Sequence, residues 1–144
     1  MITLLQRVSN ARVEVDAATI GSIGQGILVL VGVEASDDAS TARKYVDRLL
    51  HYRVFADADG KMNLSLKDID GGLLLVPQFT LAANTKKGRR PSFTSAAHPQ
   101  HGREIFEAMA VYARSVHDHV ECGWFGADMQ VHLINDGPVT FILD

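Results

Sequence analysis

An uninterrupted apolar segment, ILVLVGV at residues 27–33, constrains the fold of this chain more than any other feature. Its seven residues are far fewer than the roughly 20 that a membrane-spanning helix needs. A short apolar run without polar alternation is instead typical of a strand that is buried on both faces. The sequence therefore predicts a central strand that other elements cover on each side.

Two strands are expected before this segment, at residues 2–8 and 11–16. The second alternates polar and apolar side chains, which is the period of a half-buried strand. Gly21, Gly24 and Gly26 then indicate a turn region. Because their spacing does not match a dinucleotide-binding loop, and a strand rather than a helix follows, they favour a plain hairpin.

Three more strands are expected later in the chain. The first covers residues 73–80, but Pro77 cannot donate to a ladder, so the end of this strand must lie at an edge or an opening of the sheet. Residues 128–134 and 139–143 are predicted as the other two strands, joined by the turn-forming residues 135–138.

Two amphipathic helices complete the prediction, over about residues 38–51 and 99–118. Ser36, Asp37 and Asp38 offer N-cap oxygens to the first helix, and apolar side chains recur at helical spacing in both. Together, the elements predict an α+β fold, in which mostly antiparallel β-sheets curl into a barrel-like sandwich with the two main helices packed outside.

Length and charge limit the remaining possibilities. With 144 residues, the chain is expected to form a single domain over residues 1–144. The formal net charge is −3, so nucleic acid could be held only through a local basic patch. One cysteine cannot form an internal disulfide, which favours a reducing compartment. No signal peptide or membrane span is evident, so a cytoplasmic location is expected.

Histidine and cysteine do not predict a metal site or a cofactor. His117 and His119 are two residues apart, so on a helix they would not share a face, and a solvated helix end is the expected setting. His132 lies in an alternating strand and is expected to be a packed or surface residue. Cys122 has no adjacent cation and is expected to be an inert small apolar residue.

Two segments allow a functional interpretation beside a structural one. In Pro77-Gln78-Phe79-Thr80, an apolar strand ends in residues that bring backbone N–H groups to a sheet boundary, where they could bind an oxyanion or could simply end a strand. The segment at residues 135–140, NDGPVT, is either an ordinary hairpin turn or a specialised turn, since an X–Pro bond can be cis. Neither segment alone indicates a function.

In order along the chain, five segments resemble the D-aminoacyl-tRNA deacylase family, also described as D-tyrosyl-tRNA deacylases. The resemblance runs essentially from end to end, and the number of segments in the correct order makes coincidence improbable. The segments are Gln6-Arg7-Val8, residues 20–26 (IGSIGQG), residues 77–81 (PQFTL), Arg90-Pro91-Ser92-Phe93, and residues 135–140.

The resemblance implies an enzyme that hydrolyses the ester of D-aminoacyl-tRNA, and of glycine mischarged on tRNA(Ala). It implies a homodimer in which Gly137 and Pro138, joined by a cis bond, reach into the partner's pocket, hold the substrate's amino group and exclude L side chains. The catalytic segment is then Gln78, Phe79 and Thr80, with Arg7 bracing the incoming Gly-Pro segment. The implied partner is the aminoacylated 3′ end of tRNA, without DNA, a membrane, a metal or a cofactor.

One departure from the family pattern leaves the function open in part. The family's usual segment is Ser-Gln-x-Thr, whereas this chain has Pro77 at the serine position, which can be neither a nucleophile nor an N–H donor. A chirality-relaxed animal-type paralogue also carries Pro-Gln there, although Phe79 and the Gly-Pro-Val-Thr ending resemble the D-specific branch more closely. The sequence is also compatible with a tRNA-end binding module without activity and with a generic hydrolase of small acyl esters.

Two mechanisms and one binding loop follow from this interpretation. Either the Thr80 hydroxyl attacks the ester, which needs an activating base that the neighbouring sequence does not supply, or backbone amides near Phe79 and Thr80 stabilise the oxyanion while the RNA 2′-hydroxyl or a water completes the reaction. The second is preferred. A basic loop follows directly and could meet the phosphates of the acceptor end: Lys86, Lys87, Arg89 and Arg90.

Overall fold

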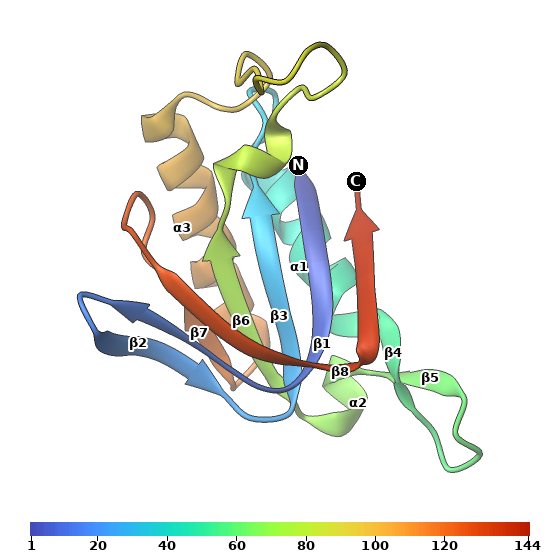
Figure 1. Ribbon diagram of the computed structural model, residues 1–144. Helices are drawn as coiled ribbons and strands as arrows, with labels where there is room; N and C mark the ends of the chain where they lie inside the picture. Colours follow the sequence, from blue (N-terminus) through green and yellow to red (C-terminus); the bar gives the residue numbers. More distant parts are fainter.

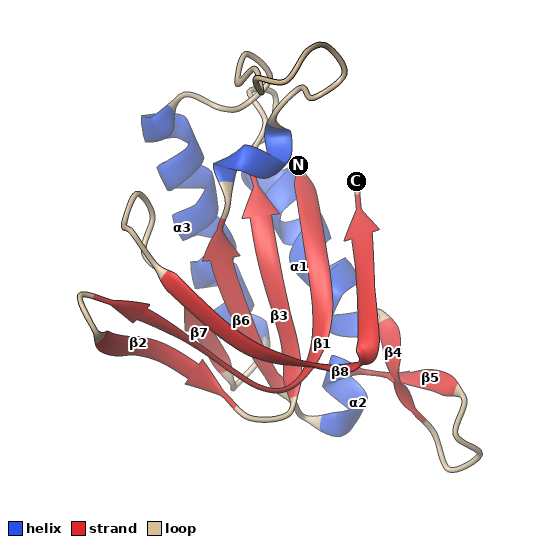
Figure 2. Ribbon diagram, in the orientation of Figure 1, coloured by secondary structure: helices blue, strands red, loops and turns tan.

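The computed structural model describes residues 1–144, which form a strongly curved six-stranded sheet with its helices on the outside (Figures 1 and 2). The strands of this sheet are β1 (Ile2–Val15), β2 (Ala18–Ile23), β3 (Gly26–Gly32), β6 (Gly72–Pro77), β7 (Val120–Cys122) and β8 (Gln130–Leu143). A small separate hairpin is formed by β4 (Arg53–Ala56) and β5 (Met62–Ser65). The helices are α1 (Ala39–His51), α2 (Leu66–Ile69), the 3₁₀ helix η1 (Phe79–Ala82) and α3 (Pro99–Val116).

The predicted apolar strand is β3, and it lies in the middle of the sheet. Its neighbours are β1, which is antiparallel to it, and β6, which is parallel. Six of its seven residues are buried, which agrees with the expected cover on both faces. The predicted fold class is confirmed: the sheet is mixed, because β3, β6 and β7 run parallel, but β1 pairs antiparallel with β2, β3 and β8.

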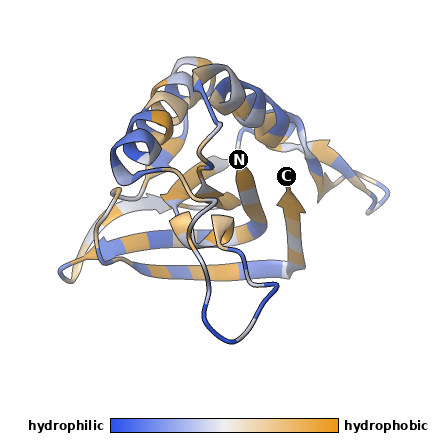
Figure 3. Cartoon of the chain, turned by 90° about the horizontal axis from the view of Figure 1, so that it is seen from above, coloured by the Kyte–Doolittle hydropathy of each residue, from blue (hydrophilic) through white to orange (hydrophobic).

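Two clusters of buried side chains cover the two faces of β3. The larger cluster lies between the sheet and the helices α1 and α3, which both pack on the outer face of the curved sheet (Figure 3). The smaller one fills the inside of the curl, where Leu28 of β3 meets Val8, Val13 and Leu74. Alternate residues of one strand thus serve different cores, which explains why the segment is apolar throughout.

The amino-terminal strands correct the prediction in two places. Residues 2–8 and 11–16 were expected as separate strands but form the single strand β1, because the hydrogen bonds to β8 continue past the exposed residues Ser9 and Asn10. The hairpin is formed by β1 and β2, with its turn at Asp16 and Ala17, which both have positive φ. The glycine segment therefore does not form the hairpin turn that was predicted for it.

The carboxyl-terminal strands also differ from the prediction. Residues 128–134 and 139–143 do not form two strands around a hairpin turn; both parts belong to β8 and pair with β1. Gln6 of β1 pairs with Thr140 of β8, and Val8 pairs with Asn135. Only Arg7 lies between the two pairs on β1, so the residues between Asn135 and Thr140 on β8 form a large bulge opposite Arg7. β6 ends at Pro77 rather than at Thr80, because proline ends the ladder and η1 begins.

Both main helices are confirmed with small changes at their ends. The Asp38 carboxylate caps α1 by accepting the N–H of Thr41 at 2.7 Å. The longer helix, α3, ends at Val116, and the following residue, His117, is buried instead of solvated because its Nε2 contacts the carbonyl oxygen of Gly71 at 2.7 Å. Neither helix combines the length and apolar character that crossing a bilayer would need.

Candidate active site

The junction between β6 and η1 presents the predicted catalytic segment. The Gln78 N–H donates to the carbonyl oxygen of Val31 at 2.7 Å, which fixes the start of the turn. Phe79 and Thr80 then begin a one-turn 3₁₀ helix, and the first N–H groups of a helix have no partner inside it. No side chain caps this helix. The junction therefore offers backbone donors to a developing oxyanion.

The hydroxyl of Thr80 is held by the neighbouring glutamine. The Gln78 side-chain amide donates a hydrogen bond to Thr80 Oγ1. An amide nitrogen cannot take a proton from a hydroxyl, whereas a nucleophilic hydroxyl needs an adjacent base. The contacts of Thr80 thus favour a role in orienting the segment over a nucleophilic attack.

Aromatic side chains flank this junction and leave an apolar cavity beside it. The rings of Phe79 and Phe93 lie 5.2 Å apart between centroids, and their side chains are 55% and 42% exposed. Exposed aromatic groups at a cavity mouth are typical of ligand sites. The cavity has a volume of about 230 Å³ and is lined by Pro77, Phe79, Ala97, Pro99, Phe125 and Gly126.

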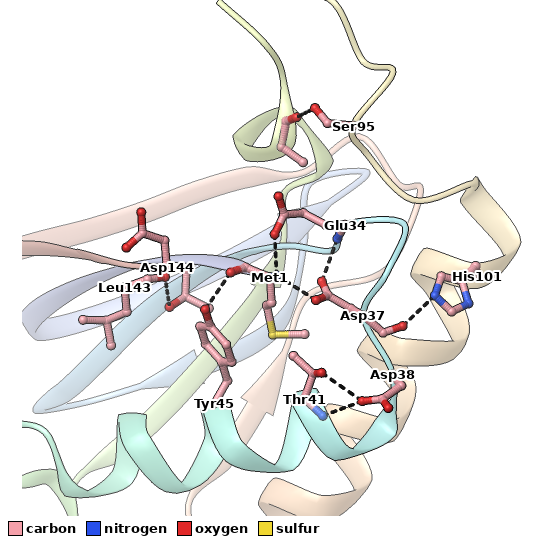
Figure 4. Close-up of polar contacts among 12 residues, drawn as sticks. Met1, Glu34, Asp37, Asp38, Thr41, Tyr45, Ser95, His101, Leu143 and Asp144 are labelled. Carbon is pink, nitrogen blue, oxygen red and sulfur yellow. Dashed lines mark hydrogen bonds and ion pairs between the residues drawn. The ribbon is translucent and has the colours of Figure 1, made fainter.

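A buried ion pair supports the segment that carries Phe93 and Ala97 (Figure 4). The Met1 ammonium nitrogen lies 2.6 Å from Glu34 Oε2 and 2.7 Å from Asp37 Oδ1, and Asp37 also accepts the N–H of Glu34. Glu34 pairs with Ala96 as an isolated bridge, and the N–H of Ala97 donates to Val33 O at 3.0 Å. The ion pair therefore fixes the loop on which one wall of the cavity rests.

This environment changes the protonation of the amino terminus. Burial lowers the pKa of the Met1 amino group, but hydrogen bonds and charge attraction from Asp37 and Glu34 outweigh that effect. The pKa consequently lies above its ordinary value, and the group remains an ammonium at neutral pH.

The four predicted basic residues, Lys86, Lys87, Arg89 and Arg90, are exposed in the loop that follows η1, at the same end of the molecule (Figure 1). Asn84 and Ser92 close the base of this loop through two backbone hydrogen bonds of 2.7 and 3.1 Å. None of the four side chains forms an ion pair within the chain. Their charges are therefore available to a phosphate backbone.

Gly137 and Pro138 lie in the bulge of β8, are exposed, and are joined by a cis peptide bond. Arg7 contacts this bulge: its Nε donates to the carbonyl oxygen of Asp136 at 3.0 Å, and its Nη1 donates to Val54 O at 2.7 Å. The side chain of Asn135 closes the bulge by accepting the Val139 N–H at 3.0 Å. Arg7 thus holds the Gly-Pro segment of its own chain in one position.

Within one chain, this segment and the η1 junction lie apart. The bulge lies opposite Arg7, which pairs with Ile27 of β3, whereas Pro77 pairs with Val31 of the same strand. The two positions are separated by about 13 Å along β3, and the bulge belongs to β8 on the far side of β1. A single chain therefore does not bring all the predicted site residues together.

Some residues of the site were not predicted from the sequence. Ala97, Pro99, Phe125 and Gly126 line the cavity, and the Met1–Asp37 pair supports it. No sequence motif marks these positions, because each acquires its place through contacts between distant segments. Phe93, which packs against Phe79 beside the cavity, differs from them, because it ends the segment Arg90-Pro91-Ser92-Phe93 that supported the family resemblance.

Comparison with known proteins places the chain in a family. The family described as D-Tyr-tRNA(Tyr) deacylase matches residues 4–144. A D-aminoacyl-tRNA deacylase of Stutzerimonas stutzeri is 61% identical over 98% of this chain and 97% of its own length. One of Legionella pneumophila is 54% identical over 99% of both chains.

Solved structures agree with this placement. The structure titled "c-Myc DNA Unwinding Element Binding Protein" has a TM-score of 0.95 and 36% identity, and the match covers 100% of this chain and 98% of that one. A structure described as a probable eukaryotic D-amino acid tRNA deacylase shares the fold, with a TM-score of 0.86 at 18% identity over 99% and 97% of the two chains. Since sequence and fold match over the whole length, the chain belongs to the D-Tyr-tRNA(Tyr) deacylase family.

Proposed function

We propose that this chain hydrolyses the ester of D-aminoacyl-tRNA, and of glycine mischarged on tRNA(Ala), to release free tRNA and the amino acid. The observation that carries this proposal is the junction at Phe79 and Thr80, where uncapped backbone N–H groups lie beside an apolar cavity and an exposed basic loop. Curated relatives with 61% and 54% identity bear the name D-aminoacyl-tRNA deacylase. A cytoplasmic location agrees with such a substrate.

The mechanism proposed here uses main-chain groups. The backbone amides of Phe79 and Thr80 bind the oxyanion that forms when the ester carbonyl is attacked, and one such donor is worth about 2.7–4 kcal/mol in other enzymes. The attacking oxygen comes from the RNA 2′-hydroxyl or a water, because Thr80 has no base beside its hydroxyl. No metal or cofactor takes part in this scheme.

Selection of the D-configuration is assigned to Gly137 and Pro138 of a second copy. Within one chain these residues lie away from the Phe79 junction, so only a homodimer can place them over the ester. β8 carries exposed apolar side chains at Ile134 and Ile142, which are 58% and 63% exposed, and such side chains suit an interface between copies. The carbonyl groups of the Gly-Pro segment would then hold the substrate's amino group and exclude an L side chain.

RNA is the proposed partner rather than DNA. Because the net charge is −3, phosphates can be bound only by a local group of cations, such as the loop at Lys86, Lys87, Arg89 and Arg90. Four clustered cations can neutralise the few phosphates of a single-stranded acceptor end, and the ester that the proposed reaction cleaves is carried by tRNA.

Incubation with aminoacyl-tRNA of either configuration tests the function. We expect release from D-Tyr-tRNA and Gly-tRNA(Ala), and no release from L-Tyr-tRNA or L-alanyl-tRNA. Release from the L-alanyl substrate as well would identify the chirality-relaxed paralogue. Binding without any release would identify the binding module, in which Pro77 in place of serine has removed the activity.

Replacement of Thr80 by alanine is expected to reduce kcat by less than about tenfold, because the backbone donors remain in place. If the RNA 2′-hydroxyl takes part, a substrate that ends in 2′-deoxyadenosine is expected to be hydrolysed more slowly by the wild type, with a larger loss of rate than Thr80→Ala causes. Single-turnover hydrolysis of D-Tyr-tRNA measures both. If the Thr80→Ala dimer still binds tRNA but has lost its activity, the hydroxyl is the nucleophile and the main-chain mechanism is wrong.

A further inference from the structure

A second and larger hollow adjoins the apolar cavity described above. It has a volume of about 650 Å³ and lies between α3 and the segment that runs from β7 toward β8. Phe125 and Gly126 line both spaces. Arg103 stands at the junction, since its guanidinium lies 5.2 Å from the centroid of the Phe125 ring and its Nη2 donates to the Phe125 carbonyl oxygen at 3.3 Å. We refer to this second space as the α3 groove.

The α3 groove has an aromatic platform and charges of both signs. Trp124 is 55% exposed at its wall. Arg103, Glu107 and Arg114 line it from α3, where their spacing of four and seven residues places them on one helix face. Glu121 lines it from β7.

We infer that the α3 groove binds the penultimate nucleotide of the tRNA acceptor end, a cytidine, with its base stacked on Trp124. The inference rests on the proposed function, because the terminal adenosine is then held beside Phe79 in the adjoining apolar cavity. The chain of the RNA passes from one space to the other over the shared residues Phe125 and Gly126.

The chemistry of the groove matches this occupant. Aromatic side chains stack on bases in single-stranded nucleic acid, and arginine meets the phosphates. The carboxylates of Glu107 and Glu121 can accept a hydrogen bond from the exocyclic amino group of cytosine. Uracil has an acceptor at that position, which a carboxylate cannot bind. A purely cationic groove would bind any strand, but the carboxylates favour cytosine over uracil.

The fluorescence of the native protein tests the inference directly, because Trp124 is the only tryptophan of the chain. Titration with the trinucleotide CCA is expected to change the emission, whereas adenosine alone should leave it unchanged. The trinucleotide CUA is expected to bind about tenfold more weakly than CCA, and the double variant Glu107→Gln, Glu121→Gln should lose this preference. An emission that does not respond to CCA would overturn the inference.

Hydrolysis of short esters gives an independent readout. Trp124→Ala is expected to lower kcat/KM about tenfold for D-tyrosyl-CCA and to leave D-tyrosyl-adenosine unchanged, with Trp124→Phe retaining most of the activity. Val111→Ala, an exposed apolar residue of α3 outside the groove, is the control. Equal effects on both esters would overturn the inference. Failure of the wild type to hydrolyse either ester would instead contradict the proposed function, while the fluorescence titration still decides whether the groove binds CCA.

Discussion

Replacement of Asp37 by alanine is expected to lower the free energy of unfolding by about 3 kcal/mol, because breaking a buried ion pair leaves its other charge without compensation. Asp37 is 6% exposed, and Met1, whose amino nitrogen it contacts at 2.7 Å, is a buried residue as well. Glu34, which is more exposed, compensates only in part. Thermal unfolding should show a fall in Tm of about 10 °C for a chain of this length.

The neighbouring residue supplies a matched control. Asp38→Ala removes only the N-cap of α1, for which a loss of about 1 kcal/mol is expected. If the two variants lower the free energy of unfolding equally, the ion pair contributes no more to stability than the N-cap does.

The same ion pair gives the stability a defined pH dependence. The pKa of the Met1 amino group is raised in the folded state, so its contribution is fully present below about pH 8, the unfolded value, and is lost as the pH rises through the folded value. The difference in stability between wild type and Asp37→Ala should therefore narrow in alkaline solution. A constant difference from pH 6 to pH 10 would contradict this assignment.

Replacement of Gly137 by alanine is expected to reduce kcat/KM for D-Tyr-tRNA about 100-fold, because a displacement of about 1 Å in a positioning group can have an effect of that size. Gly137 has φ +130°, which L residues rarely adopt. An added Cβ would lie 2.8 Å from Val139 Cγ2 and 3.0 Å from Arg7 Nη2. The bulge must shift, and with it the carbonyl groups that are proposed to hold the substrate's amino group.

A second glycine separates this effect from backbone strain. Gly60 also has a positive φ, of +76°, but an added Cβ there meets nothing within 4 Å, and it lies in the turn between β4 and β5. Gly60→Ala is expected to lower the free energy of unfolding, because alanine is strained at a positive φ, and to leave kcat/KM unchanged. If Gly137→Ala forms a dimer with the activity and the D/L selectivity of the wild type, the Gly-Pro segment does not position the substrate.

Local patterns were sufficient to predict the elements whose structure depends on periodicity. The apolar run at residues 27–33 predicted a central strand, and β3 is that strand. The apolar stripes predicted α1 and α3, and Asp38 was among the expected caps. The order of short segments along the chain predicted the family. These features depend on neighbouring residues, so the sequence alone contains them.

Only the tertiary structure decided where the segments meet. The strands at residues 128–134 and 139–143 became a single β8, because β1 pairs with both and leaves the residues between them as a bulge. His117 became buried because Gly71, 46 residues earlier, supplies its partner.

The site itself also depends on such distant contacts. Its cavity joins Pro77 to Phe125, and its support joins Met1 to Asp37. A periodic pattern specifies which face of an element is apolar, but it does not specify which distant residue that face contacts. For that reason, the sequence by itself determined the elements and the family, and the packing of the chain determined the site.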